Sequence, residues 1–126
     1  MKKIQLNNDN YLLIDELAKT IIIYIGKVGS NSRNKIGVVD KSERTIYMSR
    51  NREKHLFRKF NAYGFNEFVL KNATTFDKIY LSDNYDTWLI PLTDMLEVEK
   101  KYMHFKQQGF ELQVFILLSE LDNYKI

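Results

Sequence analysis

The segment RNREKHLFRKFNAYGFNEFVL, residues 50–70, interleaves basic and aromatic side chains at the spacing of an α-helix. Leu56, Phe60 and Tyr63 recur at intervals of four and three residues, which is the apolar stripe of an amphipathic helix. Gly64 can adopt the left-handed conformation that ends a helix. The pattern predicts one main amphipathic helix over the first part of the segment, followed after the glycine by a second short helical turn.

The other side of this predicted helix is cationic. Arg50, Lys54 and Arg58 recur every four residues, and His55 and Lys59 fill the adjacent row. Like charges at this spacing disfavour an isolated helix by about 0.2–0.5 kcal/mol per pair, so a bound anion would relieve their repulsion. We interpret the basic side as a binding surface, with an ordinary solvated face as the alternative.

The formal net charge of +3 is unevenly distributed along the chain. Residues 27–59 contain ten Lys and Arg but only three Asp and Glu, whereas residues 60–126 are net acidic. Every arginine lies between Arg33 and Arg58. Because the planar guanidinium group can make paired hydrogen bonds to phosphate or carboxylate, this confinement predicts one face for an anionic partner.

Outside the basic segment, alternating and β-branched runs predict a sheet. We expect strands at residues 4–6, 11–17, 20–28, 35–39, 45–49, 77–81, 87–91, 101–106 and 110–118, with a helix over 11–19 as a competing interpretation. A helical turn is expected at about 93–98 and another in the tail, 119–126. The short connections favour antiparallel pairing. The expected fold class is therefore α+β: a mostly antiparallel sheet, a meander of hairpins, with one main amphipathic basic helix packed on it and one or two short helical turns.

Length and composition narrow the class of protein. At 126 residues, 44% hydrophobic and 28% charged, the chain is expected to form a single domain over residues 1–126 with its own core. With no cysteine there is no disulfide, thiol nucleophile or Cys-ligated metal. We expect a cytoplasmic protein without a membrane partner, because no apolar leader or spanning run occurs. The abundance of Lys, Asn, Ile and Tyr is typical of AT-rich bacterial and mobile-element genes.

Motifs for catalysis are weak. His55 and His104 lack a second ligand at metal-binding spacing, and no phosphate-binding or dinucleotide-binding glycine motif occurs. Asp94 followed by Glu111 and Gln113 resembles the acid, acid-x-lysine arrangement of metal-dependent nucleases, but glutamine replaces the lysine. We therefore predict no catalytic residues, no metal and no cofactor, and keep a metal-dependent nuclease-like domain as a third interpretation.

Proteins that bind single-stranded nucleic acid stack its bases on aromatic side chains that lie beside cations. Most aromatics of the basic segment are expected in the core, which leaves Phe57, Phe65 and the loop residue Tyr85 as exposed candidates.

The sequence favours a non-enzymatic nucleic-acid-binding protein, of bacterial or mobile-element origin, that contacts phosphates through its basic helix. The alternative is a small protein-binding module or inhibitor that docks a charged face on a larger protein, and strand edges could also pair to form a homodimer. The predicted nucleic-acid-binding residues are the cations of the basic segment and of the loops before it: Arg33, Lys35, Arg44, Arg50, Arg52, Lys54, His55, Arg58 and Lys59.

Overall fold

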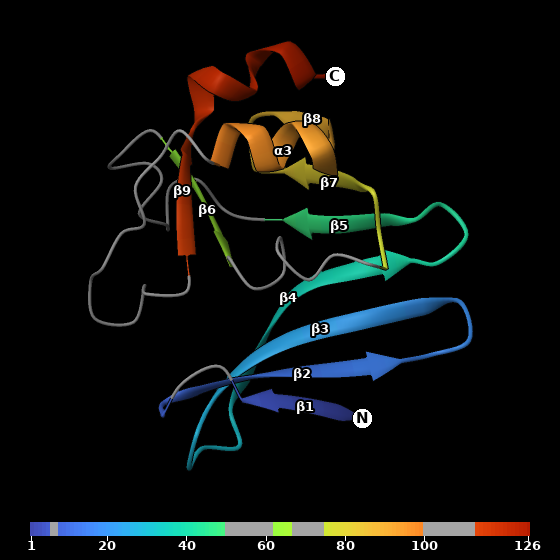
Figure 1. The fold of residues 1–126 in the computed structure, drawn as a ribbon, viewed down its shortest axis with the longest axis vertical. Coiled ribbons are helices and arrows are strands. Elements are labelled where there is room, and N and C mark those ends of the chain that lie inside the picture. The colour runs from blue at the N-terminus through green and yellow to red at the C-terminus, as the bar shows by residue number, and fades with distance from the viewer. Residues whose placement is uncertain (6–7, 50–61, 67–74, 100–112) are drawn as a thin grey trace.

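The computed structural model describes residues 1–5, 8–49, 62–66, 75–99 and 113–126. Within these residues the chain is mostly β-structure (Figure 1). The strands are β1 (Lys2–Gln5), β2 (Asn10–Glu16), β3 (Thr20–Lys27), β4 (Arg33–Asp40), β5 (Thr45–Ser49), β6 (Ala62–Asn66), β7 (Lys78–Ser82), β8 (Thr87–Pro91) and β9 (Gln113–Leu117). The helices are α3 (Leu92–Glu99) and the 3-10 helix η2 (Leu118–Tyr124).

Seven strands form one mixed sheet in the order β1-β2-β3-β4-β5-β7-β8. Neighbouring strands are antiparallel except β5 and β7, which run parallel, so the chain between them crosses over instead of turning back. Strands β6 and β9 form a separate antiparallel pair, with Ala62 opposite Leu117. In Figure 1 this pair lies on the side toward which the arrowheads of β5 and β7 point.

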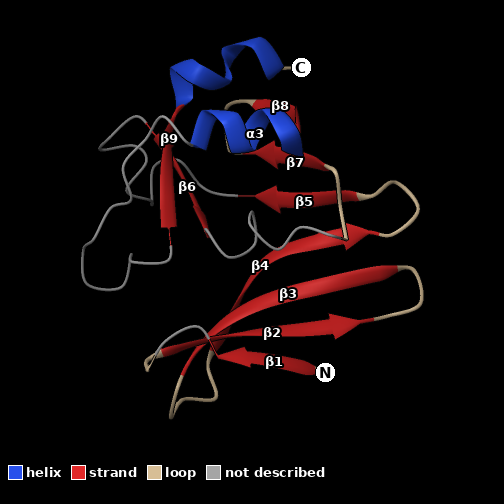
Figure 2. Ribbon diagram, viewed as in Figure 1, coloured by secondary structure: helices blue, strands red, loops and turns tan. Residues whose placement is uncertain are grey.

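One face of the large sheet carries the hydrophobic core. Alternate residues of the strands point into it, as the period-two pattern requires, except on β4, where Ile36 and Val39 are three residues apart. Helices α3 and η2 supply further apolar side chains. The fully buried members include Leu12, Val39, Ile46, Ile79, Leu81, Trp88, Ile90, Met95 and Leu121. The two helices lie at the β7–β8 end of the sheet, where Figure 2 shows them in blue.

The other face, called the outer face here, carries the intervening residues. The register places Val38, Tyr47, Tyr80 and Leu89 side by side on β4, β5, β7 and β8. Tyr47 and Leu89 are each 39% exposed, and Val38 and Tyr80 are half-buried. This row is too exposed for a core and contains aromatic side chains, so the outer face is where the described residues offer a surface for a partner.

The β8 edge of the sheet is partly closed by the last residues of the chain. Lys125 forms an antiparallel bridge with Trp88, and the Ile126 N–H donates a 2.9 Å hydrogen bond to the Thr87 carbonyl. Tyr124 anchors this segment by donating its hydroxyl to Asp94 of α3 at 3.1 Å. The bridge satisfies backbone groups that would otherwise template pairing with another chain.

The expected fold class is wrong. The described residues form a seven-stranded mixed sheet, with α3 as their one α-helix, and not an antiparallel meander under a main basic helix. Helix α3 has eight residues, carries Asp94 and Glu97, and has no basic residue in its last turn. The error arose from assuming that short connections join neighbouring strands, whereas β5 and β7 become neighbours across a long crossover.

Residues 62–66 account for a second correction. The sequence predicted the end of the main helix and a break at Gly64, but Ala62–Asn66 is strand β6, paired to β9 about fifty residues later. Tyr63 and Phe65 flank the glycine at a spacing of two, which fits a strand as well as a helix end, and the partner strand decides between them. The helical pattern over residues 50–61 and the expected strand at 101–106 lie outside the described residues.

Other elements agree with the sequence to within a few residues. Strand β3 at Thr20–Lys27 is interior to the sheet, and Ile22 on its outer face is half-buried. The helical interpretation of residues 11–19 is wrong, because Asn10–Glu16 is strand β2. The helical turn expected at about 93–98 is helix α3, which begins directly after Pro91 and has Asp94 in its first turn.

Candidate nucleic-acid interface

A β-bulge reshapes the middle of the sheet. Ile23 pairs with Gly37 and Tyr24 with Lys35, so Ile36 is an extra residue on β4. Gly37 follows the bulge at a point where an added Cβ would lie 2.8 Å from Cδ1 of Ile46 on β5. The lack of a side chain at this residue is therefore what lets the buried Ile46 pack against β4.

Beyond the bulge, β4 and β5 separate. Their pairing covers only Val38–Asp40 against Thr45–Tyr47, although β4 begins at Arg33 and β5 continues to Ser49. The separation leaves a cleft of about 230 Å³ at the carboxyl ends of the parallel strands. Among the residues that line this β4–β5 cleft are Lys35, Gly37, Tyr47, Ser49, Tyr80 and Ser82.

Two tyrosine rings lie together at this cleft. Tyr47 and Tyr80 occupy paired positions on the parallel strands, and their ring centroids are 5.0 Å apart at an interplanar angle of 39°. The Tyr47 hydroxyl donates a short hydrogen bond to the Glu43 carboxylate. This bond, more than any other contact, raises the pKa of Tyr47, so its ring stays a neutral phenol at physiological pH.

Cations lie over aromatic rings on the same face. The Arg33 guanidinium carbon is 4.8 Å from the Tyr24 ring centroid, and the Lys3 ammonium nitrogen is 4.2 Å from that of Tyr11. Tyr24 is the register partner of Lys35, which is exposed. Two of the sequence-predicted binding residues, Arg33 and Lys35, are thus brought together with aromatics that the sequence did not single out.

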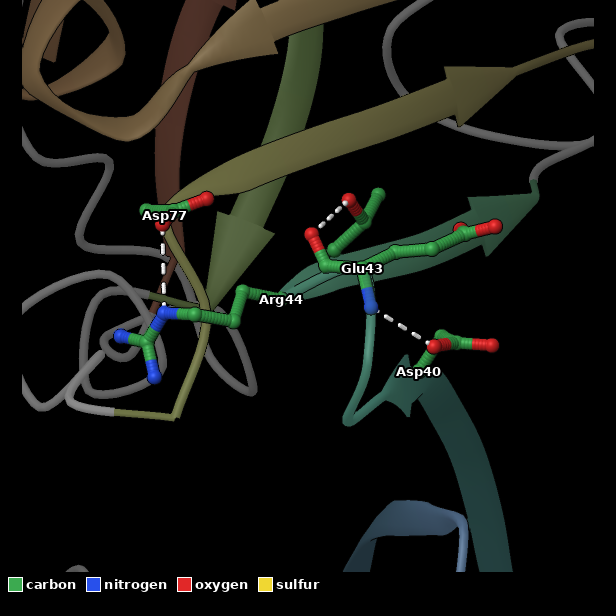
Figure 3. Close-up of polar contacts among 5 residues, drawn as sticks. Asp40, Glu43, Arg44 and Asp77 are labelled. Carbon is green, nitrogen blue, oxygen red and sulfur yellow. Dashed lines mark hydrogen bonds and ion pairs between the residues drawn. The ribbon is translucent and has the colours of Figure 1, made fainter.

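Arg44 lies elsewhere. It occupies the β4–β5 turn in the left-handed conformation, with φ of 52°, and its Nε is 3.2 Å from Oδ2 of Asp77 (Figure 3). Its carbonyl accepts hydrogen bonds from the N–H groups of Asp77 and Lys78, which joins the turn to the start of β7. Lys35 pairs with Tyr24 and Asp40 with Thr20, four residues apart on β3, so the turn that contains Arg44 begins about 13 Å along the sheet from Lys35.

The same turn holds a carboxylate that is stabilised in its ionised form. Asp40 accepts hydrogen bonds from the Glu43 N–H at 2.9 Å and the Ser42 hydroxyl at 2.8 Å (Figure 3 shows the first). These bonds, with the Glu43 N–H as the larger cause, hold the pKa of Asp40 below its ordinary value.

We expect Asp40→Asn to lower the melting temperature at about pH 7 and to have a smaller effect at about pH 3. The folded-state pKa is depressed, so the ionised carboxylate stabilises the fold above its unfolded-state pKa. That contribution disappears as the pH falls through the folded-state value. Melts followed by circular dichroism at both pH values measure the change, with Asp122→Asn as the control for loss of one exposed carboxylate. An equal effect of Asp40→Asn at both pH values would contradict the assignment.

The remaining predicted binding residues cannot be placed. They all fall within residues 50–61, outside the described part of the chain: Arg50, Arg52, Lys54, His55, Arg58 and Lys59. Of the predicted exposed aromatics, Tyr85 is 60% exposed in the β7–β8 turn, and Phe65 lies on β6. Phe57 lies outside the described residues.

The candidate nuclease residues do not form a described site. Asp94 accepts a hydrogen bond from the Tyr124 hydroxyl. Partial burial of Tyr124 is the larger cause that raises its pKa, and this hydrogen bond is the second. Glu111 is among the residues that the structure does not describe. Within the described ranges, no group of three or more His, Cys, Asp or Glu side chains is arranged to hold a metal ion.

Sequence signals for the cleft did exist. A single glycine inside a strand pattern, as at Lys35-Ile36-Gly37-Val38, is typical of a bulge or a close backbone approach. Tyr47 and Tyr80 each stand between two apolar residues, which predicts that they face away from the core. The pairing of these two tyrosines has no sequence signal, because it follows from the parallel neighbours β5 and β7.

Comparisons with known proteins add no further assignment: no protein-family model, curated protein or solved structure matches this chain. Among the described residues, no helix has both the length and the apolar character needed to cross a membrane.

Proposed function

We propose that this protein is a cytoplasmic, non-enzymatic binder of single-stranded nucleic acid, which it holds on the outer face of its sheet. The observation that carries the proposal is that Lys35 lines the β4–β5 cleft together with the Tyr47–Tyr80 pair, while Tyr24, the register partner of Lys35, carries the Arg33 guanidinium over its ring. A basic surface with aromatic side chains on which bases can stack is the combination that proteins use to bind single strands.

The cations supply the electrostatic part of binding. Arg33 and Lys35 are exposed on β4, at the end away from the acidic turn that contains Asp40 and Glu43. A phosphate at this end therefore meets two cations. Each phosphate contact releases counterions from the nucleic acid, so affinity falls with salt at a log–log slope of about −0.7 per contact for a single strand.

The tyrosines supply the part of binding that favours single strands over duplexes. The Tyr47 and Tyr80 rings lie together on the neighbouring strands β5 and β7, and Tyr24 lies on β3 across the β4–β5 cleft with the Arg33 guanidinium over its ring. Stacking on an aromatic side chain contributes about 1–3 kcal/mol per base, and it needs unpaired bases whose faces are accessible. Duplex bases are already stacked on one another.

The experiment measures fluorescence anisotropy of labelled single-stranded DNA, RNA and duplex DNA over a salt series. Arg33→Glu combined with Lys35→Glu is expected to weaken single-strand binding at least about tenfold at low salt and to reduce the slope by about 1.4. Lys2→Glu with Lys19→Glu is the matched control, because it removes the same charge from exposed positions away from the cleft. Magnesium is included, and the oligonucleotide is examined on a gel for cleavage products.

Equal losses in the two double variants would contradict the proposed surface, because a general charge effect would then explain them. Tighter binding of duplex than of single strand would contradict the stacking role of the tyrosines. Absence of any binding at low salt would overturn the proposal in favour of a larger protein as partner, and magnesium-dependent cleavage would favour the nuclease.

A further inference from the structure

The β4–β5 cleft interrupts the hydrogen-bonding pattern of the sheet. Lys35 and Gly37 pair with β3 on one side, and Met48 and Ser49 pair with β7 on the other. Among the described residues, these two stretches do not pair with each other. The cleft therefore borders on two backbone edges whose N–H and C=O groups are of the kind that can bind the edge of a nucleobase.

The side chains that line the cleft combine two chemistries. Lys35 contributes an ammonium group, and Ser49 and Ser82, which face each other across the parallel pair, contribute hydroxyls. These are donors suited to a phosphate oxygen. Tyr47 and Tyr80 line the same cleft and contribute aromatic surface. One small volume thus holds groups for an anion and for a flat ring.

The size of the cleft limits its occupant. Its volume of about 230 Å³ lies below the ~300–1,000 Å³ typical of pockets for drug-sized ligands. A helix or a run of stacked bases does not fit in such a space. A single flat ring with one attached phosphate is the occupant whose size and chemistry both agree with the lining.

We propose that the β4–β5 cleft is a nucleotide-binding subsite that takes one unstacked base of a bound strand, with the adjoining phosphate on Lys35, Ser49 and Ser82. The inference rests on the proposed function and adds a point of base recognition to it. The base lies against the Tyr47–Tyr80 pair, and the backbone groups of β4 and β5 that border the cleft contact its polar groups. Contacts at base edges carry sequence information that phosphate contacts do not.

The first test titrates the ¹⁵N-labelled protein with thymidine 5′-monophosphate, thymidine and inorganic phosphate, followed by amide chemical shifts. The nucleotide is expected to cause saturable shifts at Gly37, Ser49 and Ser82, and each of the other two compounds is expected to cause smaller ones. No shifts at these amides would overturn the subsite. Shifts as large with phosphate alone would overturn its base-binding part.

The second test fills the cleft without changing charge. Ser82→Leu is expected to weaken binding of a labelled twelve-residue oligothymidylate about tenfold while leaving the slope of affinity against salt unchanged, because no phosphate-binding cation is lost. Ser119→Leu, on an exposed position of η2, is the matched control. Thermal melts show whether both variants fold. If Ser82→Leu does not fold, the amide titration of the unmodified protein decides whether the cleft is a nucleotide-binding subsite.

The two proposals fail in different ways. If the unmodified protein binds the oligonucleotide and Ser82→Leu binds it equally well, the outer face stands as the binding surface and the subsite falls. If the unmodified protein binds no oligonucleotide at low salt, the proposed function falls, and the titration with the mononucleotide still reports whether the cleft takes a nucleotide.

Discussion

Replacing Trp88 by alanine is expected to lower the free energy of unfolding by about 3–5 kcal/mol, the range for removing a large buried aromatic side chain. Trp88 is 1% exposed, lies opposite Leu81 on the core face, and carries the bridge to Lys125 that closes the β8 edge. Domains of this size have total stabilities of about 5–15 kcal/mol, so this single change is expected to remove a large fraction of the stability.

Urea denaturation followed by circular dichroism measures this loss, and Leu89→Ala is its matched control. Leu89 is the next residue on the same strand but faces outward and is 39% exposed. Its truncation is expected to cost less than about 1 kcal/mol. Similar losses for the two variants would mean that the assignment of core and outer faces on β8 is wrong, and with it the outward placement of Tyr80, the register partner of Leu89.

Replacing Gly37 by valine is expected to cost about 3 kcal/mol, at the upper end of the range for an overpacked core. A Cβ there would lie 2.8 Å from Cδ1 and 2.9 Å from Cγ1 of Ile46, whose side chain is fully buried and has little room to move. Replacing a glycine also reduces the entropy of the unfolded chain, which stabilises by about 0.4–1 kcal/mol. The steric cost exceeds that gain, so destabilisation is the expected outcome.

A double-mutant cycle with Ile46→Val tests the cause of this loss. Ile46→Val removes Cδ1 and alone is expected to cost about 0.5–1.5 kcal/mol. In the Gly37→Val background it is expected to cost less or to restore stability, since it removes the nearest clashing atom, with a coupling of at least about 0.5 kcal/mol. Additive losses would show that Gly37 does not pack against Ile46, and the bulge would then need another explanation.

Local pattern predicted most of the strands in the described chain. Residues 20–28 and 45–49 have the β-branched and alternating character that half-buried strands need, and β3 and β5 occupy nearly the same positions. The alternation also predicts that Ile46 and Met48 face one side and Tyr47 the other, as their burial confirms. These features depend on neighbours in sequence, which is why the sequence alone suffices for them.

The helical interpretation failed where two periodicities overlap. At Ala62–Asn66 the aromatics fit a helix end and a strand equally, and the pairing with β9 selects the strand. The candidate site was predicted only in part, because here too the tertiary structure decides which residues lie together. Clustered charge pointed to Arg33, Lys35 and Arg44 together, but the length of β4 separates Arg44 from the other two.

The sequence by itself determined the β-rich character of the described chain, the alternation of its faces and the segment that contains all the arginines. Only the tertiary structure decided which strands are neighbours, because the parallel pairing of β5 and β7 depends on a crossover whose ends are almost thirty residues apart in the chain. That pairing places Tyr47 beside Tyr80 and Ser49 beside Ser82. The bulge at Ile36 then separates β4 from β5, so the cleft exists through contacts between distant residues that local propensity does not encode.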